Sequence, residues 1–174
     1  MVRLEPMDER HFDQTFKWLA VSADLRAQTD TMDVPTPGGN RCYWRRNLLD
    51  KSREDYAIVT EDGRHVGNCG LNRIDRQRSK AEMWIYLGQD YGTGTGGAAL
   101  RLLLDHAFDG LGLGRVSLRV VEGNHRAVAF YLRAGFKIEG CARADTVRDG
   151  RSIDSTLMSI LKHEHCGKRK GRGP

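Results

Sequence analysis

Closely spaced glycines between Tyr91 and Gly97 are the clearest sign of chemistry in the sequence. The run reads Tyr-Gly-Thr-Gly-Thr-Gly-Gly. It lies between a segment typical of a strand and one typical of a helix. Glycine lacks a Cβ, so the backbone can turn through positive φ and a ligand can approach the main chain closely. Because the first N–H groups of a helix are unpaired and lie at its positive end, the run predicts a phosphate-binding loop.

The same glycines also fit a second pattern. Gly92, Gly94 and Gly97 match the G-x-G-x-x-G of dinucleotide-binding folds, and Glu122 could bind the ribose. An NAD-binding oxidoreductase is therefore an alternative. In that fold the glycines usually belong to the first βαβ unit of a parallel sheet, whereas here hairpin signals precede them. The preceding segment also alternates and carries Glu82, unlike a strand buried in a parallel sheet.

A second polar group falls on one face of a helix predicted over 124–134. Asn124, Ala127 and Tyr131 are spaced i, i+3 and i+7. Their side chains therefore share a face over roughly 10 Å of helix axis. An amide and a phenol placed in this way can both contact one extended ligand. Gly135 follows, as expected where a helix ends in the left-handed conformation.

Hydrophobic periodicity and turn residues predict the elements that position these groups. Besides 124–134, helices are predicted from Asp8 with an apolar stripe to Leu19, over 41–50, and from the glycines through Phe108. The residues 31–40, with two prolines and two glycines, are predicted to form a mobile loop. Strands are predicted over six segments: 56–60, 64–74, 80–87, 116–121, 136–146 and 151–161, the last two joined by a turn at Asp149-Gly150.

This order predicts an α/β (α+β) fold in a single domain over 1–162. Strand, helix and strand in the middle imply a parallel βαβ crossover at the glycine-rich loop, while the hairpins imply antiparallel pairs, so the sheet is mixed. Residues 163–174 are predicted to be a disordered basic tail. Four positive charges of the net +5 lie there, so the rest of the chain is nearly neutral: Lys168, Arg169, Lys170 and Arg172.

Several classes of protein are disfavoured. No apolar run is long enough to cross a membrane, and no secretory leader is recognisable, so we expect a cytoplasmic protein. No helix-turn-helix, finger or aromatic-interleaved basic stripe favours nucleic-acid binding. The four cysteines have no metal-binding spacing, and we predict no metal site. A homodimer is compatible with the sequence.

The glycine-rich segment and the helix that carries Asn124 and Tyr131 both resemble sequence signatures of one family. Residues 91–96 resemble the acyl-CoA pyrophosphate loop Q/R-x-x-G-x-G/A of GNAT acyltransferases, with Tyr91 where the family usually has Gln or Arg. Residues 124–136 resemble its N-x-x-A-x-x-x-Y-x-x-x-G-F motif. The segment 139–161 resembles the terminal hairpin of the branch that includes ribosomal-protein and spermidine acetyltransferases. The resemblance implies a GNAT-like fold and transfer of an acetyl group from acetyl-CoA to a primary amine.

It also implies catalytic roles. Tyr131 would lie near the thioester sulfur and protonate the leaving thiolate. Glu82 is the predicted base, because its strand leads into the loop; a solvated pair with Arg73 or Lys80 is the equally supported alternative. Asp154 is a weaker candidate for the base. No histidine is placed beside Cys69, so direct attack by the amine is favoured over a covalent intermediate.

The remaining implied contacts belong to coenzyme A. The backbone of Ile85 to Leu87, if splayed from the neighbouring strand, could pair with the pantetheine amides. Asn124 would bind near the pantetheine arm, and Arg126 and Arg133 are candidates for the 3′-phosphate, with a solvated surface role as the alternative. The full set of predicted cofactor-binding residues is Ile85, Leu87, Tyr91, Gly92, Thr93, Gly94, Thr95, Gly96, Gly97, Asn124, Arg126 and Arg133.

The acceptor is predicted to be a small molecule such as an amino sugar, aminoglycoside or polyamine. Such a cation should bind beside carboxylates. A protein N-terminus, as in ribosomal-protein acetyltransferases, is the rival acceptor and would need an open groove. The carboxylates available in the variable N-terminal region are Asp24, Asp30, Asp33, Glu54 and Asp55.

Overall fold

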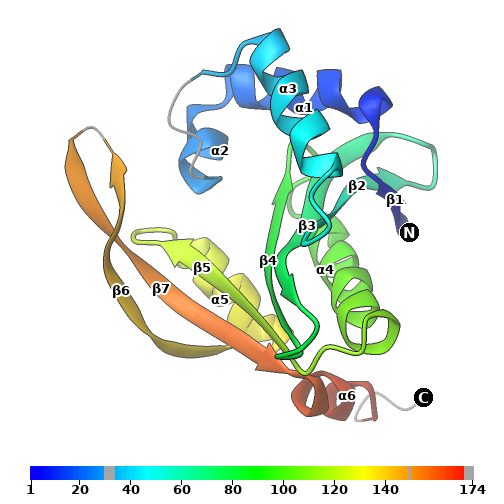
Figure 1. Cartoon of the computed structure of the whole chain (residues 1–174), viewed down its shortest axis with the longest axis vertical. Coiled ribbons are helices and arrows are strands. Elements are labelled where there is room, and N and C mark those ends of the chain that lie inside the picture. The colour runs from blue at the N-terminus through cyan, green and yellow to red at the C-terminus, as the bar shows by residue number, and fades with distance from the viewer. Residues whose placement is uncertain (30–33, 149, 171–174) are drawn as a thin grey trace.

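A seven-stranded mixed sheet forms the centre of the molecule in a computed structural model that describes residues 1–29, 34–148 and 150–170 (Figure 1). The strands lie in the order β1-β2-β3-β4-β5-β7-β6. Only β4 and β5 pair in parallel; the other five neighbouring pairs are antiparallel. The predicted mixed sheet is confirmed. The strands are β1 Val2–Pro6, β2 Glu54–Thr60, β3 His65–Asp75, β4 Lys80–Leu87, β5 Arg115–Val121, β6 Lys137–Arg148 and β7 Arg151–Leu161.

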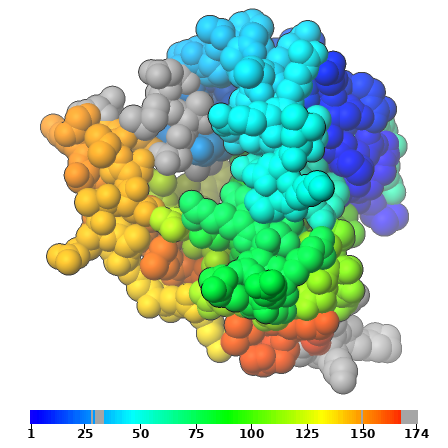
Figure 2. Space-filling view, viewed as in Figure 1, coloured from blue at the N-terminus to red at the C-terminus, as the bar shows by residue number. Residues whose placement is uncertain are grey.

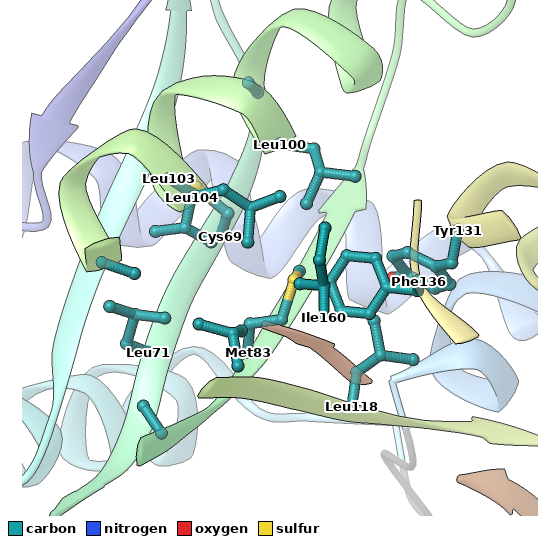
Figure 3. Packing of buried hydrophobic residues seen from close by; sticks show 14 of the residues in the cluster. Cys69, Leu71, Met83, Leu100, Leu103, Leu104, Leu118, Tyr131, Phe136 and Ile160 are labelled. Atoms are coloured by element: carbon teal, nitrogen blue, oxygen red, sulfur yellow. The ribbon is translucent and has the colours of Figure 1, made fainter. Parts of the chain in front are cut away.

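The parallel pair requires a crossover, and α4 provides it between β4 and β5. Three leucines of α4 pack on one face of the sheet, in a cluster with Cys69, Leu71 and Met83 (Figure 3): Leu100, Leu103 and Leu104. Because strand side chains alternate, the intervening residues of β4 face the other way. The helices are α1 Glu9–Val21, α2 Ala23–Gln28, α3 Pro37–Leu48, α4 Thr95–Asp105, the π-helical turn η1 His106–Gly110, α5 His125–Ala134 and α6 Lys162–Lys170.

The N-terminal helices cover the opposite face of β3 and β4. Trp18 and Leu25 pack with Tyr86, while Phe12 and Trp44 pack beside Trp84. In Figure 1, α1, α2 and α3 lie together at one end of the sheet, and the β6–β7 hairpin reaches back toward α2. Arg148 at the end of β6 donates a hydrogen bond to the Ala27 carbonyl in α2.

Some predicted bounds in the N-terminal region are wrong. The helix expected at 41–50 begins at Pro37, because Thr36 accepts a hydrogen bond from the Gly39 N–H at 3.0 Å and proline fits the first turn of a helix. The prediction of a loop over 31–40 therefore fails from Pro37 onward, and its residues 31–33 lie outside the described residues. The edge strand β1 and the short helix α2 were not predicted.

The prediction of a disordered tail from residue 163 is also wrong where the structure describes it. Helix α6 continues directly from β7. His165 is buried, and its Nε2 lies 2.6 Å from an Asp105 carboxylate oxygen. Lys162 donates to the Phe108 carbonyl at 2.7 Å, and Glu164 accepts from the Leu161 N–H at 2.9 Å. These contacts hold the first turn of α6 against the body of the protein.

Candidate active site

The parallel strands β4 and β5 diverge after a short paired stretch. Their register runs from Lys80↔Arg115 to Glu82↔Ser117, while β5 continues to pair with β7 along its whole length. The edge of β4 at Ile85 to Leu87 therefore faces an opening rather than a neighbouring strand. The splay was the condition set for this edge in the sequence analysis, and it leaves backbone groups that an extended ligand can pair with as an added strand would.

The glycine-rich loop closes one end of this opening. Gly92 and Gly94 have positive φ values of 79° and 85°, and Gly94 is the N-cap of α4 with no side-chain hydrogen bond. A Cβ at Gly92, Gly94 or Gly97 would meet no atom within 4 Å. The loop is thus open, and the uncapped first turn of α4 leaves N–H groups for an anion.

A cavity of about 590 Å³, here called the donor cavity, joins the loop, the splay and α5. Ten of the twelve predicted cofactor-binding residues line it, while Thr93 and Thr95 do not. The hydroxyls of those two threonines instead lie 2.8 Å apart. Figure 2 shows the surface hollowed between the β6–β7 hairpin and the body that carries α3 and β4. The ten are Ile85, Leu87, Tyr91, Gly92, Gly94, Gly96, Gly97, Asn124, Arg126 and Arg133.

Helix α5 places its polar residues on this cavity as the spacing predicted. Asn124 caps the helix by accepting from the Ala127 N–H at 3.1 Å, which leaves its amide N–H groups as donors. Tyr131 also lines the cavity, although only 8% of it is exposed. Its ring packs against Phe130 and Phe136 (Figure 3). Burial raises the pKa of Tyr131, so the phenol keeps its proton at neutral pH.

Tyr91, the residue that departs from the family pattern, links the loop to α5. Its hydroxyl donates to the Leu87 carbonyl at the end of β4. The guanidinium of Arg126 lies over its ring, 5.7 Å from the ring centroid. Tyr91 therefore fixes Arg126 at the cavity by a cation–π contact.

The predicted base lies elsewhere. Both oxygens of Glu82 accept hydrogen bonds from Arg73 at 2.9 Å, and Glu82 does not line the donor cavity. The ion pair with Arg73 was the alternative considered from sequence. Asp154 accepts from the Ala144 N–H at 2.8 Å and does not line the cavity either. Cys69 is fully buried, and burial raises the pKa of its thiol, which disfavours a thiolate nucleophile.

A second cavity of about 490 Å³, here called the acceptor cavity, lies on the other side of β4. Ile85 and Tyr86 line both cavities, so the two meet at the splayed end of β4. Four aromatic residues and one arginine dominate the second: Tyr43, Trp44, Trp84, Tyr86 and Arg53.

The predicted carboxylates do not line this acceptor cavity in the part of the chain that is described. Asp24 lines the donor cavity instead. Glu54 lies 2.6 Å from His106 on the other face of the sheet, and Asp55 is paired with Arg53. Asp30 and Asp33 lie outside the described residues. The expectation of an acidic pocket is therefore not met by the residues that can be placed.

Sequence reasoning missed Ser22 and Leu25 and assigned Asp24 to the acceptor. All three residues, from the start of α2, contribute to the donor cavity. Ser22 caps α2 and accepts from the Leu25 N–H at 3.0 Å. The Ser-Ala-Asp segment was an available helix-start signal. A six-residue helix has too little periodicity to be recognised otherwise.

Within the described parts of the chain, no helix is both long and apolar enough to span a membrane.

Comparisons agree with this geometry. A family model for an acetyltransferase (GNAT) domain matches residues 2–137. An uncharacterized N-acetyltransferase of Bacillus licheniformis, p20, is 33% identical over 63% of this chain, which spans 62% of p20. Spermidine N(1)-acetyltransferase of Escherichia coli K12 is 28% identical over 73% of this chain and 71% of that protein. Spermidine N-acetyltransferase from Vibrio cholerae, solved with CoA and spermine, superposes with a TM-score of 0.85 at 18% identity, covering 95% and 98% of the two chains.

Fold and site thus define an enzyme that transfers acyl groups from a coenzyme A thioester. The chain belongs to the GNAT acetyltransferase family, whose acyl donor is acetyl-CoA. The predicted family, fold and donor are confirmed, and the alternative of an NAD-binding oxidoreductase is rejected.

Proposed function

We propose that this protein transfers an acetyl group from acetyl-CoA to the primary amine of a small molecule, by direct attack in a ternary complex. One observation carries the proposal. The donor and acceptor cavities meet at Ile85 and Tyr86, so a thioester along β4 and an amine from the other side can come together. Holding two reactants at one place is itself a large part of catalysis.

The residues that would hold acetyl-CoA follow from the cavity. The open glycine loop and the first turn of α4 suit the pyrophosphate, and the edge of β4 at Ile85 to Leu87 suits the pantetheine amides. Arg126 and Arg133 supply positive charge for phosphate at the same cavity. Asn124 offers amide donors between these two regions.

The chemical step then needs two proton transfers. The amine nitrogen bonds to the thioester carbonyl carbon, the carbon–sulfur bond breaks, and the departing sulfur takes a proton from Tyr131. The amine loses a proton to a base. Since only Tyr131 of the two predicted catalytic residues lines the donor cavity, we assign it the acid role; Glu82 would act as base only through intervening water.

A small acceptor is favoured over a protein N-terminus. The acceptor cavity has the volume typical of small-molecule sites, which run from about 300 to 1,000 Å³. The names of related enzymes specify spermidine, a small primary amine. We therefore include polyamines, together with amino sugars and aminoglycosides, in the class to be tested.

The test is acetyl-CoA consumption by the purified full chain against a panel of amines. Release of CoA thiol should depend on both substrates, and mass spectrometry should find the product heavier by one acetyl group. A ribosomal-protein N-terminal peptide serves as the comparison. Acetylation of the peptide but of no small amine would contradict the proposed acceptor class.

A further inference from the structure

The acceptor cavity contains an arginine held in place by a buried carboxylate. Arg53 lines the cavity, and its Nε and Nη2 lie 3.2 and 3.1 Å from the two oxygens of Asp55. The Asp55 side chain is 2% exposed and that of Arg53 16%. A guanidinium has five N–H donors, and this pairing uses two of them. Tyr43 is a further hydrogen-bonding neighbour of this guanidinium. Asp55 therefore orients a donor group that still has N–H groups beyond those that contact Asp55 and Tyr43.

Three further side chains that line the same cavity each have a buried polar atom with no hydrogen-bond partner among the described residues. Trp44 is 97% buried, and its Nε1 donor makes no hydrogen bond. The Oδ1 acceptor of Asn72 is likewise buried and unpaired. The Nε1 donor of Trp84 is also unpaired, with the Asp55 carboxylate close by. Buried polar groups are nearly always satisfied, so these atoms indicate a ligand that offers them partners.

The two kinds of unsatisfied atom set the chemistry of that ligand. Arg53 and Trp44 donate, so they need an oxygen acceptor, while Asn72 accepts and needs an N–H. No described residue that lines the cavity carries a carboxylate, so a polycation would find no acidic partner on its described walls.

We propose that the acceptor is an amine that also carries a carboxylate, as an amino acid does. Arg53 and the Trp44 N–H bind the carboxylate, and Asn72 binds an N–H group. The aromatic side chains Tyr43, Trp84 and Tyr86 surround the apolar part. This inference rests on the proposed function, because it names the substrate class of the same site. It separates this chain from the spermidine enzymes that it resembles.

The test uses amines that differ only in the carboxylate. L-phenylalanine is compared with 2-phenylethylamine and L-methionine with 3-(methylthio)propylamine, at saturating acetyl-CoA, with spermidine as the polycation. We expect kcat/KM to be about 10- to 100-fold higher for the carboxylate member of each pair, the effect of a hydrogen-bonded charge.

Substitutions in the acceptor cavity test whether its residues cause the preference for a carboxylate. The double variant Arg53→Gln/Asp55→Asn removes both charges together, which avoids a lone buried carboxylate. It should bring the ratio within each pair close to one. Trp44→Phe keeps an aromatic ring without the N–H and should lower the ratio partway. Arg76→Gln, at an exposed arginine outside the cavity, should leave the ratio unchanged.

Two results would overturn the inference. Spermidine or the carboxylate-free amines could be the better substrates, or the double variant could keep the ratio of the wild type. Either leaves acetyl transfer to a small amine intact. A protein that neither binds acetyl-CoA nor acetylates any amine would instead refute the proposed function, and this inference with it.

Discussion

Tyr131 illustrates how the environment of one residue sets its role. Its phenol lies at the donor cavity, yet its ring is enclosed by Phe130 and Phe136. Because burial raises its pKa above the ordinary value of 10.0, the protonated form persists at higher pH than for an exposed tyrosine. A group that keeps its proton can donate it, or a hydrogen bond, to the departing sulfur.

For Tyr131→Phe we therefore expect kcat to fall by about 10²-fold or more, the usual contribution of a general acid. The KM for acetyl-CoA should change little, since the loop and β4 make the binding contacts. The pH profile of the wild type should show no descending limb from Tyr131 below about pH 10. Steady-state kinetics across pH measure all three, and an unchanged kcat in the variant would remove Tyr131 from the mechanism.

Glu82 is the second residue whose role can be measured. The Arg73 guanidinium occupies both of its oxygens, and it lines neither cavity. We expect Glu82→Gln to reduce kcat/KM by less than about tenfold, whereas loss of a base in contact with substrate costs about 10²- to 10⁴-fold. A loss in that larger range, with a shifted acidic limb of the pH profile, would make Glu82 the base after all.

At the scale of elements, binding of acetyl-CoA depends on the residue that connects the glycine loop to α4. Gly94 is the N-cap and has a φ of 85°, a conformation that costs an L-residue roughly 1–2 kcal/mol. A Cβ at Gly94 would meet no other atom within 4 Å. An alanine there therefore adds backbone strain and hinders the approach of a ligand to the backbone, but it causes no clash.

We expect Gly94→Ala to raise the KM for acetyl-CoA by about tenfold while lowering stability by roughly 1 kcal/mol. Gly112→Ala is the matched control, because Gly112 has a φ of 70°, equally open surroundings and a place before the start of β5, and it does not line the donor cavity. It should show the same loss of stability and an unchanged KM. Equal effects of the two variants on KM would argue against phosphate binding at this loop.

The contacts of the first turn of α6 with the body of the protein lead to a further prediction. Deletion from Lys162 onward removes the His165–Asp105 contact and the Lys162 bond to the Phe108 carbonyl. With net hydrogen bonds worth about 1 kcal/mol each, we expect a loss of roughly 1–3 kcal/mol in the free energy of unfolding. Denaturant titration measures it. Deletion of residues 171–174 alone keeps these contacts and is the comparison; identical stability of the two truncations would contradict the account of α6.

For the whole molecule, much of the fold follows from sequence because its middle has strong local signals. The alternation in β4, the apolar stripe of α4 and the turn before β7 each specify one conformation. Most of the donor site was predictable for the same reason: apart from Ser22, Asp24 and Leu25, its residues lie on two contiguous segments. Ten of the twelve predicted cofactor-binding residues share one cavity.

The acceptor cavity was not predictable, because it is built by tertiary contacts. Arg53 comes from the segment before β2, Trp44 from α3 and Asn72 from β3, and no spacing in the sequence links them. The acidic residues chosen from the sequence were plausible by charge alone. Glu54 and Asp55 follow each other on β2, so they point to opposite faces, and each has an arginine partner, Arg76 and Arg53 respectively. The presence of a charged residue in a sequence does not show on which face of the sheet its side chain lies.

The central claim is that the glycine loop, the splayed edge of β4 and α5 together hold acetyl-CoA. Thermal unfolding of the full chain with acetyl-CoA, compared with NADH at the same concentration, tests it most directly. At a hundredfold excess over Kd, acetyl-CoA should add about 2.7 kcal/mol to the free energy of unfolding and raise Tm accordingly, with a smaller rise in Gly94→Ala. NADH should leave Tm unchanged. A Tm that responds to NADH, or that ignores acetyl-CoA at millimolar concentration, would contradict the account.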